Sequence, residues 1–413
     1  MEMNCKHKNQ LIGCCGLDCE VCDARIATLT NDTTLREKTA ALWTKLNGVP
    51  ITPEMIHCTG CRAEGAKTPF CDKLCPVHHC VREKSLDACA DCGQMDSCPT
   101  LVIDNCTNKG TVVSNMNGNC FIGGIAGVNY AAAIRDCTNE AEVKFVQANA
   151  AGAGYLCIGG IAGQTYSGAK VTGCANRAAV SSDKLQVTRI GGIVGTHNAS
   201  TIDDCSNSGD ITLAYTATAN NWEAAGGIVG FYDGTDGTAV TNGCTNSGKV
   251  SATVNSSNAN IGAGGIAGII KSGHATNNTN DGAVWMHNAQ AGKSSYAGGI
   301  VGYDYNTKDK SAVTGNVNNG AVQATVEGTS ALLAAGGIIG RNDVGAVSGC
   351  RNFGAVACAL HAGALVGWNK KSVEDSAAGG SVNGTALTGT NYAELAVGFQ
   401  DGGSSSGITF GEK

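Results

Sequence analysis

The chain has 413 residues, enough for two or three domains, and its formal net charge of −6 reflects 28 Lys+Arg against 34 Asp+Glu. This balance gives no basic excess that would draw the chain to nucleic acid or to an anionic membrane. No apolar run is long enough for a membrane span, and residues 1–10 lack the apolar core of a signal peptide. We therefore expect a cytoplasmic protein in which the 22 cysteines stay reduced.

Composition changes abruptly near Pro99. All five prolines lie at or before this residue, whereas only six of the 59 glycines do. The change predicts two different kinds of polypeptide joined end to end. We expect a cysteine-rich module over residues 1–100, a glycine-rich domain over 101–383, and a C-terminal cap followed by a flexible Gly/Ser tail over 384–413.

Two helix starts are predicted in the first module. Asn31 and Asp32 are N-cap candidates for an amphipathic helix that ends before Gly48. Thr52 and Pro53 are an N-cap and N1 pair for a second helix. Few large apolar residues remain outside these helices, and a domain of roughly 90 residues with so small a core usually needs metal ions as staples. We therefore predict a small α-rich, zinc-stapled module.

Eleven cysteines of this module have spacings typical of metal sites. A Cys-x2-Cys pair can place both thiolates around one cation with a tight turn between them. One such pair is common by chance, but three pairs with flanking cysteines are a strong signal. The predicted ligands are Cys15, Cys19, Cys22, Cys58, Cys61, Cys71, Cys75, Cys80, Cys89, Cys92 and Cys98.

Eleven ligands do not divide into sites of four. Adding His57, His78 or His79 would give twelve ligands and three tetrahedral sites, and two sites with spare thiols are equally compatible. The predicted cofactor is therefore Zn²⁺, two or three ions. The alternative is an iron–sulfur cluster, because the first three cysteines of the series have the spacing of radical-SAM enzymes. A thiol enzyme is a weaker alternative.

This module resembles the DUF3795 family, a small family of cysteine-rich bacterial and archaeal proteins of unknown function. The resemblance implies a zinc-binding domain with no known activity. It makes Cys71 and Cys75 the less secure ligands, because they lie in a less regular stretch. The motifs that carry it, in order, are Cys15–Cys22, Leu35–Thr39, Ile56–Cys61, Cys80–Lys84, Cys89–Cys92 and Cys98–Pro99.

The glycine-rich domain is a tandem repeat of two blocks. Self-similarity at this period predicts a solenoid or a propeller, and we expect an all-β solenoid (β-helix) of about eight coils. The first block, Gly-Gly-Ile-(Ala/Val/Ile)-Gly, starts at Gly123, Gly159, Gly191, Gly226, Gly264, Gly298 and Gly336, with a degenerate copy at Gly363. The second, Cys-x-Asn-x-Gly-x-Val, starts at Cys106, Cys137, Cys174, Cys205, Cys244, Asn278, Asn316 and Cys350, with a decayed copy at Ser376.

Coils that stack in register place equivalent residues in columns. The isoleucine of the first block should form one interior column, and the Cys and Val positions of the second block another. The Cys position also accepts Asn and Ser, which indicates a small buried residue rather than a metal ligand or nucleophile. The repeated Asn of the second block indicates a turn or a stack of side chains.

These repeats resemble the GLUG-type motif of bacterial surface proteins, in which a Gly-Gly-Leu-Val-Gly-like block is followed by a Cys and a Gly-x-Val. The resemblance implies an extracellular adhesive or structural array. A cell-surface location is therefore the alternative to the cytoplasm.

Aromatic residues follow the first block in most coils, where the repeat itself imposes no residue. If the coils stack, these residues lie along one edge, where they would suit sugar rings or a protein partner. Packing at the corners between coils is the alternative. The candidate ligand-binding residues are Tyr130, Tyr166, His197, Tyr232, Tyr303, Tyr305 and Trp368.

The sequence thus predicts a non-enzymatic zinc-binding protein whose solenoid is a binding, adhesive or self-assembling scaffold. The alternative is a glycan-active β-helix lyase or hydrolase, which needs paired carboxylates, or a base beside Arg or Lys, in one groove. The acidic candidates form no convincing constellation in the sequence, and no catalytic residue is predicted. They are Asp203, Asp204, Asp233, Asp236 and Asp304.

Overall fold

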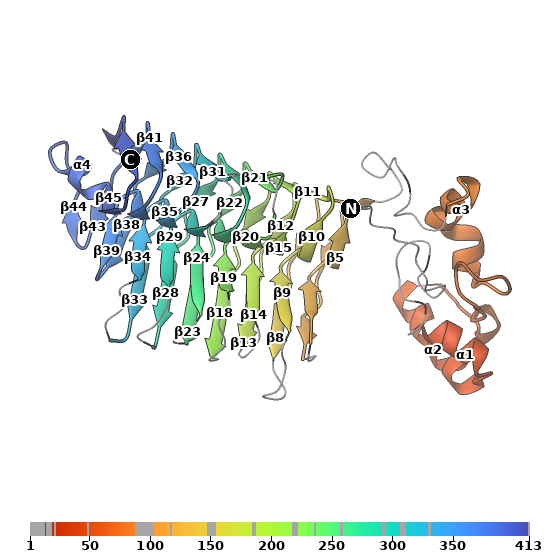
Figure 1. The fold of residues 1–413 in the computed structure, drawn as a ribbon. Coiled ribbons are helices and arrows are strands. Elements are labelled where there is room, and N and C mark those ends of the chain that lie inside the picture. The colour runs from red at the N-terminus through yellow and green to blue at the C-terminus, as the bar shows by residue number, and fades with distance from the viewer. Residues whose placement is uncertain are drawn as a thin grey trace. The chain divides into compact units, whose positions relative to one another are not determined.

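The computed structural model divides into two compact units, Met1–Val102 and Ile103–Lys413, and each is considered by itself (Figure 1). No helix in the described ranges is long and apolar enough to cross a membrane. The structure describes residues 13, 19, 22–47, 49–86, 92, 102–115, 118–146, 154–183, 187–216, 222–234, 237–256, 259–290, 294–305, 311–328 and 332–411.

The first unit is built from short helices. Asp32 caps the second of them, since its Oδ1 accepts the backbone N–H of Leu35 at 2.9 Å, as the sequence predicts. The predicted start at Thr52 opens only a single 3₁₀ turn, because Ile56 already leaves the helical region with ψ 61°. The helices are α1 (Asp23–Leu29), α2 (Thr33–Asn47), η1 (Pro53–Met55), η2 (Phe70–Leu74) and α3 (Pro76–Glu83).

The second unit is a β-solenoid of about eight turns, with few helices before it. A complete coil contains five short strands, as in the coil from β16 to β20, and each strand pairs with its counterparts in the coils before and after. The result is five sheets, numbered 1 to 5 here in the order in which a coil visits them (Figure 1). All strand pairs in them are parallel except β43 with β44.

Sheet 1 contains β1 (Val102–Asp104), β6 (Ala133–Arg135), β11 (Lys170–Thr172), β16 (Thr201–Asp203), β21 (Val240–Asn242), β26 (Gly273–Thr276), β31 (Ser311–Thr314), β36 (Ala346–Ser348), β41 (Ser372–Glu374) and β46 (Ser404–Ser406). Sheet 2 contains β2 (Thr107–Asn108), β7 (Thr138–Asn139), β12 (Ala175–Asn176), β17 (Ser206–Asn207), β22 (Thr245–Asn246), β27 (Thr279–Asn280), β32 (Val317–Asn318), β37 (Arg351–Asn352), β42 (Ala377–Ala378) and β47 (Thr409–Phe410). Sheet 3 contains β3 (Val112–Ser114), β8 (Val143–Val146), β13 (Val180–Asp183), β18 (Ile211–Thr216), β23 (Val250–Asn255), β28 (Val284–Asn288), β33 (Val322–Val326), β38 (Ala355–Cys358), β43 (Ser381–Val382) and β44 (Thr385–Ala386).

Sheet 4 contains β4 (Cys120–Gly123), β9 (Tyr155–Gly159), β14 (Val187–Gly191), β19 (Trp222–Gly226), β24 (Asn260–Gly264), β29 (Ser295–Gly298), β34 (Leu333–Gly336) and β39 (His361–Gly363). Sheet 5 contains β5 (Ala126–Tyr130), β10 (Ala162–Tyr166), β15 (Val194–His197), β20 (Val229–Tyr232), β25 (Ala267–Ile270), β30 (Val301–Asp304), β35 (Ile339–Asn342), β40 (Val366–Asn369) and β45 (Val397–Gln400).

The isoleucines of the first block form the predicted interior column. Ile228 is fully buried, and its N–H donates to the carbonyl of Ile266 at 3.0 Å, one coil further on. The same backbone bond links the other copies, and their side chains belong to one hydrophobic core. The stacking register inferred from the repeat is therefore confirmed.

The cysteines of the second block are small interior residues, as predicted. Cys205, for example, is buried in the same core, and its thiol lies 3.3 Å from the carbonyl oxygen of Asp203. The exception is Cys106 in the first coil, which is exposed. These thiols meet the backbone rather than a ligand.

The repeated asparagines form a ladder of side chains through the interior. Each amide donates to the next amide oxygen, as Asn207 does to Asn246 at 2.8 Å and Asn246 to Asn280 at 2.8 Å. Asn246 Nδ2 also donates to the carbonyl of Gly248 at 2.9 Å, which closes the turn within its own coil. The stacked-side-chain interpretation of this position is confirmed, and the ladder satisfies polar groups that would be costly to bury alone.

This ladder explains why the second position of the first block is glycine. A Cβ on Gly227 would lie 2.3 Å from the Cγ of Asn246 and 2.0 Å from the carbonyl oxygen of Gly265. The second glycine of every intact block faces the ladder Asn of the following coil in the same way. In the degenerate first block that glycine is replaced by Ala364, and the ladder Asn of the following coil is replaced by Ala378. The two blocks therefore vary together because they are in contact.

The C-terminal residues differ from the prediction. The stretch expected to be a flexible Gly/Ser tail forms strand β46, which pairs with β41, while β45 and β47 pair with β40 and β42. Helix α4 (Tyr392–Leu395) precedes β45, and the Leu395 carbonyl accepts the N–H of Ala364 at 2.7 Å. Residues 397–410 thus continue the solenoid as an incomplete coil, because the serines can pair their backbone with the coil before.

Candidate binding face

Three consecutive positions after the first block have different surroundings. In β20, Phe231 points out of the solenoid, Tyr232 points into it, and Asp233 follows the strand end, since successive strand residues alternate between faces. The neighbouring coils repeat this arrangement in register. The predicted aromatic row is therefore divided among an inward column, an outward column and a strand-end row.

The inward column corrects two predicted ligand-binding residues. His197 and Tyr232 are both fully buried, and their rings pack edge to face with centroids 5.1 Å apart. His197 Nδ1 lies 3.0 Å from Thr165 Oγ1, and the Tyr232 hydroxyl donates to Thr241. Burial lowers the pKa of His197 to about 4, so the ring is neutral in the core. These two residues stabilise the interior and cannot contact an external ligand.

The outward column and the strand-end row bring the other predicted residues to one surface, together with the outward side chains of sheet 4. We call this surface the aromatic face. Tyr130 and Tyr166 stack edge to face at its N-terminal end, with centroids 4.7 Å apart. Besides Tyr130 and Tyr166, the aromatic face comprises Tyr155, Arg189, Trp222, Phe231, Asp233, Lys271, Tyr296, Tyr303, Tyr305, Arg341, Asp343, His361, Trp368, Lys370, Phe399 and Asp401.

One ionic cluster of this face is centred on Asp233. Its two carboxylate oxygens meet Arg189 Nη1 at 3.3 Å and Lys271 Nζ at 3.0 Å. The Arg189 guanidinium lies 4.0 Å from the ring centroid of Phe231 and 5.0 Å from that of Tyr155. Both distances are within the range of a cation–π interaction. The cluster lines an open pocket of about 380 Å³.

Stacked aromatic rings also line this pocket. Trp222 and Tyr305 stack with centroids 3.9 Å apart and an interplanar angle of 11°. Tyr303 lies 5.7 Å from Trp222 and 5.4 Å from Tyr305, so the three rings form one group. Two of them, Trp222 and Tyr305, are only partly buried and keep surface available for contact.

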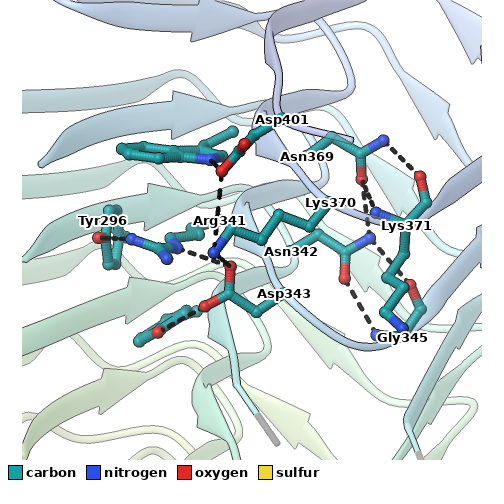
Figure 2. A network of polar contacts seen from close by, with 11 residues as sticks. Tyr296, Arg341, Asn342, Asp343, Gly345, Asn369, Lys370, Lys371 and Asp401 are labelled. Carbon is teal, nitrogen blue, oxygen red and sulfur yellow. Dashed lines mark hydrogen bonds and ion pairs between the residues drawn. The ribbon is translucent and has the colours of Figure 1, made fainter. Parts of the chain in front are cut away.

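A second ionic cluster lies at the other side of these rings (Figure 2). Arg341 Nε donates to Asp343 at 2.8 Å, and Lys370 lies between Asp343 at 3.5 Å and Asp401 at 3.8 Å. The Arg341 guanidinium is 4.4 Å from the Trp368 ring centroid. The other contacts of the cluster are Arg341 Nη1 to Tyr296 at 2.6 Å, Tyr303 hydroxyl to Asp343 at 2.9 Å and Trp368 Nε1 to Asp401 at 3.1 Å.

The two arginines and the lysines were not predicted as site residues. The sequence nevertheless holds a signal for the lysines and the acids. Each comes one position after the inward residue of its coil, and the four residues are Asp233, Lys271, Asp343 and Lys370. Aligning the repeats on that position would have placed them in one row. Arg189 has no such signal, since it lies on sheet 4 and reaches the row only through the fold.

The acidic candidates for an enzyme do not converge among the described residues. Asp203 ends β16 on sheet 1, Asp204 follows it, and Asp236 lies outside the described residues. Asp304 is fully buried, as is Glu223, whose Oε2 accepts the Thr188 N–H at 2.6 Å. Burial raises the pKa of both interior acids. Neither can act on a substrate at the aromatic face.

Asp304 makes the stability of the solenoid depend on pH. Burial raises its pKa from an ordinary 3.8 to about 7, so the folded state holds a proton that the unfolded chain releases. Between about pH 4 and pH 7 we expect the contribution of Asp304 to stability to fall by about 1.4 kcal/mol per pH unit and then to level off. Urea unfolding across this range should show that the slope of Asp304→Asn differs from the wild-type slope by this amount, because the buried Glu223 and His197 add the same pH dependence to both proteins. An unchanged slope in the variant would assign the dependence to another group.

The first unit brings some of the predicted metal ligands together. Cys61 and Cys71 are adjacent, and their hydrogen bond raises the pKa of the Cys71 thiol. Cys19, Cys61 and Cys75 share one small core, whereas Cys22 and Cys58 belong to another. No group of three or more ligands poised for a metal occurs in the part of the unit that the structure describes. Cys15, Cys89 and Cys98 lie outside the described residues.

One histidine of this unit is unusual. His78 is buried, at 4% exposure, and neither ring nitrogen has a hydrogen-bond partner among the described residues. A buried polar group without a hydrogen-bond partner is rare, and it is usually explained by a bound ion, a water molecule or a functional role. His57 and His79 are exposed. Of the three histidines considered from the sequence, His78 is the one whose surroundings fit a ligand.

Comparison with known proteins supports both resemblances inferred from the sequence. Residues 11–102 match the family described as "Protein of unknown function (DUF3795)", and residues 187–212 match the GLUG motif. A search of curated proteins finds no match. The chain is also similar to a solved structure titled "Crystal structure of a putative immunoglobulin A1 protease from Bacteroides ovatus". The identity is 16% and the TM-score 0.36, over 67% of this chain and 78% of that chain, which carries no functional argument.

Proposed function

We propose that this is a non-enzymatic binding protein in which the solenoid presents the aromatic face to an extended ligand. The observation that carries the proposal is the continuity of that face across consecutive coils. Several of its rings keep exposed surface, with Tyr155 50% exposed and Phe399 39% exposed, whereas Phe231, Tyr296 and Tyr303 are buried. Tyr and Trp offer large rigid contact surfaces at low entropic cost, and residues of this kind dominate binding hot spots.

The polar side chains of the face suit binding better than catalysis. Asp233 is neutralised by Arg189 and Lys271, and Asp343 by Arg341 and Lys370. Both oxygens of each carboxylate already have a partner, which leaves neither carboxylate poised to take a proton from a substrate. The same ion pairs fix the side chains in place, which reduces the entropy lost when a ligand binds.

The test is a screen of the whole chain against glycan and protein arrays, followed by Trp222→Ala. We expect the substitution to weaken binding at least tenfold while the melting temperature changes little, because Trp222 packs on the outside of the solenoid. Trp285→Ala is the matched control, since Trp285 points outward from sheet 3 beside His287, away from the face. Loss of binding in the control alone would place the site on sheet 3. Turnover of any glycan would favour the enzyme alternative.

For the first unit we propose two or three structural zinc ions held by the predicted cysteines, with His78 as the additional ligand. The buried, unpartnered nitrogens of His78 and the adjacency of Cys61 and Cys71 support this proposal. Zinc would supply folding free energy to a unit whose two cores are small. An iron–sulfur cluster is the competing cofactor.

Metal analysis tests this proposal directly. We expect two or three equivalents of zinc per chain, and about one fewer in His78→Ala, because a site that loses one of four ligands binds zinc weakly. His57→Ala, at an exposed position, should keep the full content. A chelator should unfold this unit and leave the solenoid folded. Less than one equivalent of zinc, or a brown iron chromophore, contradicts the proposal.

A further inference from the structure

Beyond binding itself, the geometry points to the ligand: we propose that the aromatic face binds an uncharged linear polysaccharide that lies along the solenoid axis. This inference rests on the proposed function, because it names the ligand class of the same face. Four properties of the face carry it: its length, its repetition, its charge balance and the way its rings are presented.

The length of the face favours a polymer. The part of it from Tyr155 in β9 to Phe399 in β45 covers seven coils in the stacking order. At about 4.8 Å per coil this distance is roughly 34 Å. The side chains of the aromatic face are spread along this length rather than gathered in one deep cavity, and the pocket at Asp233 is open. A ligand that contacts both ionic clusters has to extend over the roughly 14 Å between them.

The face also repeats. Asp233 and Asp343 occupy the same strand-end position in coils that are three apart, and each is followed one coil later by a lysine, Lys271 and Lys370. An arginine packed on aromatic rings accompanies each pair. Two similar clusters at a spacing of roughly 14 Å along a straight axis suit a ligand whose own chemical groups recur along its length.

The charges are almost balanced within the face. Four cations (Arg189, Lys271, Arg341 and Lys370) meet three carboxylates, those of Asp233, Asp343 and Asp401. A nucleic acid or a sulfated glycan would need cations that are not already paired, because its affinity comes from neutralising its own charge. A ligand rich in hydroxyl groups can instead donate to the carboxylates and accept from the cations without leaving a charge uncompensated.

The rings provide the apolar part of the recognition. The flat side of each aromatic ring carries partial negative charge, so it attracts the slightly positive C–H groups on the flat side of a sugar ring. Trp222 and Tyr305 are stacked with each other, and Trp368 packs against Phe399 with centroids 5.2 Å apart, so each cluster has a rigid platform beside it. Alternating platforms and fixed polar groups match the alternating C–H faces and hydroxyls of a polysaccharide. A peptide that adds to a sheet needs a free strand edge, which this outer surface of paired strands does not offer.

The experiment uses the full chain in affinity electrophoresis against soluble xylan, mannan and mixed-linkage β-glucan, with heparin as the polyanion. We expect at least one neutral polysaccharide to bind, with little change between 50 mM and 500 mM NaCl. Trp222→Ala and Trp368→Ala, one near each cluster, should each weaken binding at least tenfold, and Trp285→Ala should not. Oligosaccharides too short to span both clusters should bind at least tenfold more weakly than the polymer.

The outcomes separate this inference from the proposed function. Binding of heparin alone, with a steep salt dependence, or failure of every neutral polysaccharide overturns the inference. If a protein ligand binds through Trp222 and Trp368, the proposed function stands, but the inference that the ligand is a polysaccharide fails. If a ligand is found and neither substitution affects it, both proposals fail. Melting temperatures of the two variants within a few degrees of the wild type show that the losses do not come from unfolding.

Discussion

Ile228→Asp is expected to destabilise the solenoid by more than about 4 kcal/mol, because it places an unpaired carboxylate in the interior column. Ile228 is fully buried, and its neighbours in the column are isoleucines of the adjacent coils. No Lys or Arg side chain is buried among the described residues, so none is at hand to neutralise the charge. Unfolding in urea, followed by circular dichroism, measures the change.

Thr212→Asp is the control for this substitution. Thr212 lies in β18 of the same coil and is exposed, so its side chain points away from the core. The variable position Thr218, which the sequence suggests for the same purpose, lies outside the described residues. We expect the control to change stability by less than about 0.5 kcal/mol. Equal effects at the two positions would contradict the register described above.

Gly227→Ala should be nearly as damaging, although it adds only one methyl group. The new Cβ would lie 2.0 Å from the Gly265 carbonyl oxygen and 2.3 Å from the Asn246 Cγ, and neither neighbour can move without disturbing the next coil. We expect a loss of at least about 3 kcal/mol, at the upper end of the range for overpacking. Differential scanning calorimetry should show a clear fall in the melting temperature.

Gly389→Ala is the matched control, because a Cβ at Gly389 would meet nothing within 4 Å. This substitution should leave stability unchanged or slightly raise it, since alanine restricts the unfolded chain more than glycine does. If Gly227→Ala proves as mild as Gly389→Ala, the contact between the glycine and the Asn ladder is not a constraint on the fold.

The repeat made the solenoid predictable from the sequence. Its period fixed which residues stack, so the burial of Ile228 and the ladder through Asn246 followed from position alone. The contact between Gly227 and Asn246 was not foreseen, because the two blocks are separated along the chain and meet only across the interior.

The aromatic face was predictable only in part. Tyr303, Tyr305 and Trp368 were assigned to one surface, and the structure places them there. His197 and Tyr232 were assigned to it as well, but a shift of one residue along a strand reverses the direction of a side chain. Arg189 could not be foreseen, since it reaches Asp233 from another sheet and the preceding coil.

Ala364 replaces a block glycine and Ala378 replaces the ladder Asn that this glycine would face. This paired replacement bears on how such a chain can change in length. Because the fit of each coil depends on matched positions in the two blocks, a duplicated coil would bring its own matched Gly and Asn and would meet neighbours that carry the same pair. No new interface would have to arise. Gene duplication could therefore lengthen the solenoid one coil at a time, and each added coil would extend the aromatic face by one more strand-end position on which selection could act.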